Sequence, residues 1–336
     1  MDGAGGTLAL SVVVALVLVA LAFDFMNGFH DAANSIATVV STGVLKPWQA
    51  VIWAASFNVL AWAVFHLSVA ATVGTGIIDP SIVDSRVIFG ALIGAISWNL
   101  ITWYYGIPSS SSHALIGGMI GAAVAKAGAT PLLWPGILKT AAFIFVSPLL
   151  GLLFGAFIMV SLSWGFFRET PRRVDRAFRR MQLISSAAYS LGHGGNDAQK
   201  TMGIIWLLLI ANGVTTGDHL PAWVVMSCFL AIGLGTMFGG WRIVKTMGQR
   251  ITKLKPLGGF AAECAGSITL FLATHFGIPV STTHTITGAI IGVGTARGAS
   301  AVRWAVAGDI VVAWVITIPA SAAIAAFAWW TGRVFF

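Results

Sequence analysis

The chain has 336 residues, of which 57% are hydrophobic and only 9% are charged. A soluble domain usually carries about 25% charged residues, so the composition excludes an ordinary soluble enzyme or binding module. The formal net charge of +8 does not indicate nucleic-acid binding, because the basic residues gather in short segments between apolar runs. Apolar runs near the length of a bilayer span recur along the chain and predict an all-α polytopic membrane protein.

The first apolar run, residues 8–24, is followed by the polar motif Gly28-Phe29-His30-Asp31-Ala32-Ala33-Asn34. An ionised side chain at the bilayer centre costs about 2.5–3.5 kcal/mol on insertion scales, so an aspartate in this place indicates a functional site. We expect a broken helix, unwound at 27–34, since irregular backbone at membrane depth survives where protein or a cavity satisfies it. Residues 48–73 are predicted to form the second span.

Two shorter apolar pieces, 87–105 and 113–127, flank the segment Gly106-Ile107-Pro108-Ser109-Ser110-Ser111-Ser112-His113. A proline and four consecutive hydroxyls do not suit the lipid-facing middle of a helix. These pieces are therefore predicted to be the arms of a re-entrant helical hairpin whose tip lies inside the protein. Residues 132–160 then span the membrane and lead to an arginine-rich loop at 168–180.

The second half repeats this order. Its polar motif, Gly194-Gly195-Asn196-Asp197-Ala198-Gln199-Lys200-Thr201, predicts a second helix broken at 192–201. Its tip, Gly277-Ile278-Pro279-Val280-Ser281-Thr282-Thr283-His284, aligns with the first tip without a gap. The expected spans, arms and loop are 183–212, 219–241, the basic loop 242–255, 258–276, 284–296 and 301–330.

One internal duplication explains both pairs of motifs. When the basic segments are placed in the cytoplasm, the two halves have opposite topology, with the N- and C-termini outside. We expect a first inverted repeat at 1–160, a basic cytoplasmic linker at 161–182 and a second inverted repeat at 183–336. Inverted repeats with two broken helices and two re-entrant hairpins are typical of secondary transporters.

The polar side chains expected at membrane depth form one candidate site. Tip hydroxyls, together with the N–H groups that begin each outgoing arm, suit an oxyanion, because helix N-termini carry partial positive charge. The aspartates repel such an anion unless a cation or a proton lies between them. The carboxylates are therefore expected to hold coupling cations, which in turn hold the anion.

These roles divide the candidate residues. The oxyanion-binding candidates are Ser109, Ser110, Ser111, Ser112, Ser281, Thr282, Thr283, Asn196, Gln199 and Lys200. The coupling-ion candidates are His30, Asp31, Asn34, Asp197 and Glu263, whereas His113 and His284 are either tip anchors or proton carriers. Two cysteines without metal spacing predict no resident metal; the alternative is a sodium ion at Asp31, Asn34, Asn196 and Asp197.

The two polar motifs resemble the duplicated signature of the inorganic phosphate transporter (Pit) family, G-A-N-D-x-A-N-A and G-x-N-D-A-Q-K. The paired G-[IL]-P-x-S-x-[TS]-H tips are also similar, and the resemblance covers essentially the whole chain. It implies a symporter that imports inorganic phosphate, alone or as a metal-phosphate complex carrying Mg²⁺ or another divalent ion. It implies no enzymatic activity and no cofactor.

His30 departs from the asparagine that is usual in the first motif, and G-F-H-D resembles the bacterial low-affinity carriers of the inner membrane. An imidazole beside an aspartate can gain and lose a proton near neutral pH, so we expect protons ahead of sodium as the coupling ion. Asn58 likewise stands where sodium-dependent animal relatives have a glutamate.

Other functions are kept open. A sulfate permease on the same scaffold is the nearest alternative, because sulfate is also tetrahedral, although it lacks the P–OH that a carboxylate can recognise. An intramembrane aspartyl or metal-dependent hydrolase needs its paired aspartates within a few Å and no cation between them. A channel fits less well than alternating access. A homodimer is a further expectation.

Overall fold

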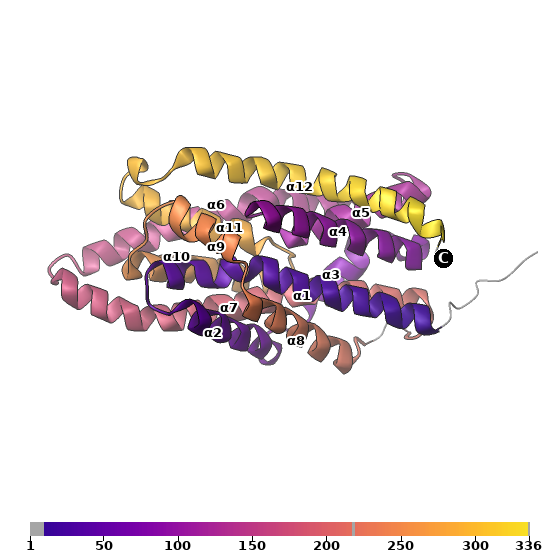
Figure 1. Ribbon diagram of the computed structural model, residues 1–336, viewed down its shortest axis with the longest axis horizontal. Coiled ribbons are helices and arrows are strands. Elements are labelled where there is room, and N and C mark those ends of the chain that lie inside the picture. Colours follow the sequence, from indigo (N-terminus) through magenta and orange to yellow (C-terminus); the bar gives the residue numbers. More distant parts are fainter. Residues whose placement is uncertain (1–9, 217–218, 335–336) are drawn as a thin grey trace, which may run out of the picture.

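The computed structural model describes residues 10–216 and 219–334. Within these ranges the regular structure is helical, apart from an isolated β-bridge between Ile78 and Leu132 (Figure 1). Five of the described helices are long and apolar enough to cross a membrane, or up to seven spans when each of two bent helix pairs counts as one. The chain is therefore an all-α polytopic membrane protein, as predicted.

The helices of the two halves follow one another in the same order. The first half contains α1 (Leu10–Ser41), α2 (Pro47–Leu60), α3 (Ser68–Gly76), α4 (Ser85–Tyr105), α5 (Ser111–Ala127) and α6 (Trp134–Gly165). The second half contains α7 (Pro171–Ala211), α8 (Ala222–Phe238), α9 (Trp241–Lys245), α10 (Pro256–His275), α11 (Thr282–Ala296) and α12 (Trp304–Thr331).

The two aspartate motifs do not break their helices, so the predicted unwinding at 27–34 and 192–201 is wrong. Both motifs lie inside continuous helices, α1 and α7. Their polar side chains are buried against other helices and the hairpin tips rather than against lipid. The backbone can therefore keep its intrahelical hydrogen bonds, which are the cheapest arrangement at membrane depth.

The breaks lie in the next span of each half. α2 with its 3₁₀ extension bends by 83° into α3, within the predicted straight span 48–73. α8 bends by 62° into α9 and the short π-helix Thr246–Arg250, so the expected basic loop at 242–255 is helical for most of its length. The fold contains two broken helices, as predicted, at positions different from those expected.

Both predicted re-entrant hairpins are present, α4 with α5 and α10 with α11. Each incoming arm ends at a glycine in the left-handed region, Gly106 (φ 68°) and Gly277 (φ 62°), which favours a residue without a Cβ. The arms enter from opposite ends of the molecule (Figure 1). Their tips meet in the middle, where the rings of His113 and His284 are 4.6 Å apart.

Each hairpin is held by the bent helix pair of the other half. Thr72 on α3 donates a hydrogen bond to the carbonyl of Gly277 at 2.7 Å. Thr246 in the π-helix donates to the carbonyl of Gly106 at 3.0 Å. These two contacts correspond to each other, so each bend places a hydroxyl at the turn of the opposite hairpin.

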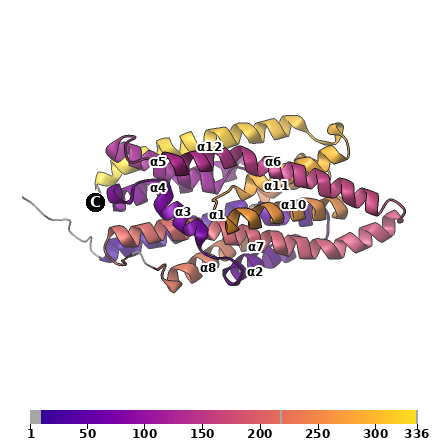
Figure 2. The same cartoon turned by 180° about the vertical axis from the view of Figure 1, so that it is seen from behind.

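The last helix of each half packs against the hairpin of the other half. α6 packs along α11, and α12 packs along α5 (Figure 2). A Cβ on Gly288 would lie 2.1 Å from the carbonyl oxygen of Pro148, and one on Gly121 would lie 2.1 Å from that of Ala322. Glycine at these positions allows the close approach of the backbones, as is common between membrane helices.

The arginine-rich segment is not the loop that was expected at 168–180. α6 extends to Gly165 and α7 begins at Pro171, so most of the residues in the expected linker 161–182 are helical. Figure 1 shows this connection at one end of the molecule, with the start of α1 and the end of α12 at the opposite end. We call these the basic end and the terminal end.

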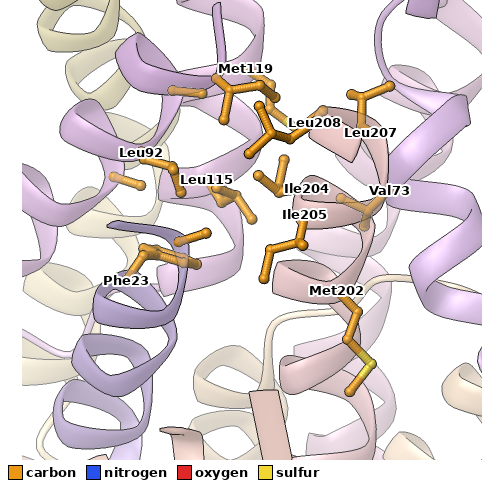
Figure 3. Packing of buried hydrophobic residues seen from close by; sticks show 14 of the residues in the cluster. Phe23, Val73, Leu92, Leu115, Met119, Met202, Ile204, Ile205, Leu207 and Leu208 are labelled. Atoms are coloured by element: carbon orange, nitrogen blue, oxygen red, sulfur yellow. The ribbon is translucent and has the colours of Figure 1, made fainter. Parts of the chain in front are cut away.

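A cluster of apolar side chains fills the terminal half of the interior, between the aspartates and the terminal end. Figure 3 shows Phe23 of α1, Leu92 of α4, Leu115 of α5 and Ile204 and Ile205 of α7 pointing toward one another. Each of these side chains is at most 2% exposed, so they are shielded from solvent. We call this group the apolar seal.

Candidate functional site

The two motif aspartates meet at the centre of the molecule. One ligand atom each of Asp31, His193 and Asp197 lies within 4.8 Å of the others, and all three side chains are at most 2% exposed. His193 and Asp197 are one turn apart on α7, with Nε2 and Oδ2 separated by 3.3 Å. Two carboxylates at this separation and burial require positive charge between or beside them.

Lys200 supplies that charge to Asp197. Its ammonium donates to Oδ1 of Asp197 at 2.5 Å, to the hydroxyl of Ser112 at 2.5 Å and to the carbonyl of Val280 at 2.7 Å. All three of its N–H donors are therefore used. Thr282 donates to the other carboxylate oxygen of Asp197 at 3.0 Å. Lys200 thus joins α7 to both hairpin tips and is not a free phosphate ligand in this conformation.

His30 is the partner of Asp31. Its Nδ1 lies 2.6 Å from Oδ1 of Asp31, and its Nε2 lies 3.0 Å from the hydroxyl of Thr102 on α4. The hydroxyl of Ser109 in the first tip donates to the same Thr102 oxygen at 3.0 Å. A continuous set of exchangeable hydrogens therefore runs from Asp31 to the first hairpin.

Several buried polar atoms have no hydrogen-bond partner among the described residues, and two of them, on Asn34 and Ser111, face the centre. Asn34 donates to Thr282 at 3.2 Å and to Thr283 at 2.9 Å, but its Oδ1 bonds to nothing. The hydroxyl of Ser111, at the start of α5, is also buried and unpaired. Because a buried unpaired polar group costs about 1–3 kcal/mol, both are places where a ligand would add hydrogen bonds.

The tips present two helix N-termini to this centre. Ser110 caps α5 by accepting from the backbone N–H of His113, and Ser281 caps α11 by accepting from that of His284, each at 3.2 Å. The first turns of both helices leave further N–H groups without intrahelical acceptors. Facing N-termini of this kind favour an oxyanion.

Two predicted phosphate ligands lie at the edge of the centre. Asn196 donates to Thr274 at 3.0 Å and to the carbonyl of Ile278 at 3.2 Å, and so braces the second hairpin. Gln199 accepts a hydrogen bond from the backbone N–H of Val69 at 2.9 Å, and its amide nitrogen donates to two backbone carbonyls. Gln199 thereby fixes the start of α3 at the first bend.

Glu263 lies apart from the aspartates, toward the basic end. Its carboxylate accepts from Gln182 at 2.8 Å and from Ser185 at 2.5 Å, both on α7. Ser185 precedes Asp197 by 12 residues (197 − 185), which is about 18 Å along a helix. Glu263 is therefore a separate buried carboxylate and does not share the central site.

The tip histidines are packed against each other and against α12. The ring of His284 stacks on Trp314 with centroids 3.8 Å apart, and both imidazoles are buried. Nδ1 of His113 and Nε2 of His284 have no hydrogen-bond partner among the described residues. These contacts suit the predicted role of tip anchors.

Three residues at the centre were missed in the sequence. His193 completes the aspartate group, Thr102 receives His30, and Asp24 accepts from Thr201 at 2.8 Å. His193 lies one helical turn from Asp197, and Asp24 lies two turns from Asp31, so both share a helix face with a motif aspartate. An i±4 and i±7 extension of each motif finds them; Thr102 comes from another helix and carries no local signal.

The arrangement can bind an oxyanion together with a cation or proton. Hydroxyls, amides and helix N-termini face the two carboxylates, and each carboxylate has its own nitrogen partner, Lys200 or His30. An aspartyl hydrolase instead needs two carboxyl groups that share one proton. The geometry is that of a binding site.

Comparison with known proteins agrees with this reading. The model of the phosphate transporter family matches residues 27–325. A "Probable low-affinity inorganic phosphate transporter" of Rhizobium meliloti (strain 1021) is 62% identical over 95% of this chain and 96% of its own length. A protein of the same description from Bacillus subtilis (strain 168) is 45% identical over 97% and 99%. These relatives are named as transporters and not as enzymes.

A solved structure also resembles the chain. It is described as "The sodium-dependent phosphate transporter", and it covers 97% of this chain and 100% of its own chain with a TM-score of 0.86. The two sequences are 25% identical. The likeness extends over both halves and both hairpins.

Proposed function

The chain belongs to the phosphate transporter family, and we propose that it imports inorganic phosphate as a secondary active symporter that works by alternating access. The observation that carries this proposal is the meeting of Asp31 and Asp197 beside two hydroxyl-rich helix N-termini. Neither half binds an anion and a cation alone. The complete site needs one carboxylate and one tip from each half.

Phosphate is favoured over sulfate by the acceptors at the centre. Oδ1 of Asn34 is unpaired, and the carboxylate of Asp197, which lies beside that of Asp31, accepts a hydrogen bond from Thr282 of the second tip at 3.0 Å. These oxygens can accept a hydrogen bond from the P–OH of phosphate, a group that sulfate lacks at neutral pH. Ser111 and the tip N–H groups donate to the unprotonated oxygens.

Protons are the coupling ion that this site supports best. When only Nδ1 of His30 is protonated, Thr102 can donate to Nε2; when both nitrogens are protonated, Thr102 accepts and its hydroxyl donates to the carbonyl of Trp98 at 2.9 Å. Both states fit without movement of the ring. The His30–Asp31 pair can therefore carry one proton through the cycle.

Sodium is the alternative, because the structural relative is described as sodium-dependent. A sodium ion would take oxygens of Asp31, Asn34, Asn196 and Asp197. Two features disfavour it here: His30 and Lys200 occupy one oxygen of each carboxylate, and Asn196 is turned to the second hairpin. A divalent ion such as Mg²⁺, which prefers oxygen ligands, would enter with phosphate as cargo.

The basic end is assigned to the cytoplasm of a bacterial inner membrane. The α6–α7 connection and the segment before α10 carry clusters of arginine and lysine, as the positive-inside rule describes. The terminal end, with the end of α12, then faces outside. Phosphate would enter from the apolar-seal side and leave beside Glu263.

Reconstitution tests this proposal. Purified protein in lipid vesicles should take up radiolabelled phosphate in preference to sulfate, and an inward proton gradient should increase the initial rate. A protonophore should remove the increase. Equal uptake of sulfate would contradict the assignment of substrate, and stimulation by sodium with indifference to the proton gradient would contradict the assignment of coupling ion.

A further inference from the structure

The basic end holds a cavity of about 970 Å³ that lies away from the central site. It opens between the α6–α7 connection and the start of α10. Five cationic side chains line it, from α7, the residue before α10 and the residue after α11: Arg172, Arg176, Arg179, Lys255 and Arg297. Two acidic residues, Glu169 and Asp175, also line it, so the lining carries a net positive charge.

The acidic residues of the cavity are already paired. Glu169 bonds to Arg173 at 3.1 Å, and Asp175 bonds to Arg179 at 2.8 Å. Arg172, Arg176 and Lys255 take part in none of the ion pairs of the described residues. Three uncompensated cations around one hollow attract an anion with several oxygens, above all one that accepts the paired N–H groups of arginine.

A single layer of side chains separates the cavity from the buried carboxylate of Glu263. Thr42, which lines the cavity, donates to Oε1 of Gln182 at 2.9 Å, and Gln182 donates to Glu263 at 2.8 Å. A Cβ on Gly259 would lie 2.2 Å from Nε2 of Gln182, so the glutamine fills the space beside α10 completely. We call Thr42, Gln182 and Glu263 the polar floor.

A stripe of polar residues on α1 joins this floor to the centre. Asp31, Asn34 and Thr38 share one face of α1, and Thr42, directly after the last residue of the helix, continues this face because its N–H bonds to the carbonyl of Thr38 at 3.0 Å. All four side chains are buried, although none is apolar. Charged or polar cargo leaving the aspartates toward the basic end therefore meets polar groups at every turn.

We propose that the basic cavity is a second phosphate-binding site, which receives phosphate from the central site on the cytoplasmic side through the polar floor. This inference rests on the proposed function. The ligand class is a phosphate anion, and its source is the transported phosphate and not the headgroup of a membrane lipid. Arg172 and Arg176 on α7 and Lys255 before α10 are its principal ligands.

Neutralising the cavity tests this site. We expect the double variant Arg172→Gln/Arg176→Gln to raise the KM for phosphate presented at the cytoplasmic face by about threefold to tenfold, through loss of local attraction. The KM at the outer face should not change. The matched control is Arg168→Gln/Arg180→Gln, which removes the same charge from exposed positions outside the cavity lining. It should shift neither KM.

The measurement uses vesicles with a known protein orientation and phosphate exchange from each face, in neutral lipid and in lipid with an anionic phospholipid. A shift confined to the cavity variant and the cytoplasmic face, in both lipids, supports the site. An equal shift in the control variant would show diffuse surface charge, and a shift only in anionic lipid would show a lipid site; either result overturns the proposal.

The same experiment separates this proposal from the proposed function. Unshifted KM values for the cavity variant, with normal phosphate exchange by the wild type, would refute the second site alone. Wild-type vesicles that exchange phosphate from neither face would refute the proposed function. If the double variant does not fold, the two single variants are measured instead, and each should give a smaller shift of the KM at the cytoplasmic face.

Discussion

The buried side chains of α7 differ in polarity on the two sides of Asp197. Beyond Thr201, which bonds to Asp24, the buried side chains toward the terminal end are apolar, with Ile204 and Ile205 packed into the apolar seal against Phe23 (Figure 3). Toward the basic end they include several polar side chains, among them Gln182 and Ser185, which bond to Glu263. Helix α1 changes in the same direction, because its buried side chains from Val13 to Phe23 are apolar, whereas Thr38 and, just beyond the end of the helix, Thr42 follow Asp31.

This difference indicates how each side of the site opens. Apolar packing admits no ion, because a charge beside it would lose its hydration without compensation. A hydrogen-bonded layer can exchange its partners with a passing anion or proton, since each such bond contributes only about 0.5–1.5 kcal/mol net. The duplicated halves therefore form a structure that is closed by packing toward the terminal end and by exchangeable hydrogen bonds toward the basic end.

The largest effect is expected at the junction of the two regions. Asp31→Asn removes the carboxylate that His30 faces at 2.6 Å, and phosphate uptake should fall to background. Uptake into vesicles and gel filtration of the purified protein measure function and folding separately. Asp84→Asn, which breaks the peripheral pair with Lys126, is the control and should retain uptake. Normal uptake by Asp31→Asn would remove the basis for the proposed mechanism.

The buried pair of Asp197 and Lys200 gives the next effect. Lys200→Met leaves a buried carboxylate without its cation and should lower the free energy of unfolding by about 3–5 kcal/mol. The double variant Asp197→Leu/Lys200→Met should recover most of that stability but no transport. Thermal unfolding and uptake report the two properties. Transport by the double variant would show that the pair is structural only.

The apolar seal should respond differently from the polar side. Ile204→Ala, in a fully buried position, is expected to cost about 2–5 kcal/mol of stability and to loosen the outer closure. Proton leakage into vesicles without phosphate should therefore rise. Val311→Ala, on the exposed face of α12, is the control and should change neither property. Unchanged proton leakage in vesicles with Ile204→Ala would show that the seal lies elsewhere.

The smallest effect is expected in the polar floor. Ser185→Ala removes one hydrogen bond from Glu263 and should cost about 1 kcal/mol of stability. It should change the rate of phosphate release without increasing proton leakage. Exchange and net efflux, measured in the same vesicles, distinguish release from binding. If Ser185→Ala increased proton leakage as much as Ile204→Ala does, the polar floor and the apolar seal would not differ in how they close the site.

The hairpins could be predicted from the sequence because their signals are local. Glycine, proline and hydroxyl residues in one short segment define both tips, and the aligned histidines locate their meeting point. The meeting of Asp31 and Asp197 followed from the duplication, because an inverted repeat brings equivalent motifs together.

The positions of the breaks could not be predicted in the same way. Polar side chains in an apolar run were interpreted as irregular backbone, but partners on other helices satisfy them: Thr282 bonds to Asn34, and Thr102 bonds to His30. The bend after α2 depends on Gln199, which caps α3 from a distant part of the chain. Such partners are known only after the helices are packed.

Access to the two regions of α1 and α7 tests the account most directly. In a background in which Cys228 and Cys264 are replaced by alanine, Thr38→Cys and Ile205→Cys place one thiol on each side of the aspartates. A membrane-impermeant thiol reagent is applied to either face of oriented vesicles, without phosphate. We predict that Thr38→Cys reacts from the cytoplasmic face and that Ile205→Cys reacts from neither. Reaction of Ile205→Cys from outside, with Thr38→Cys protected, would contradict the account.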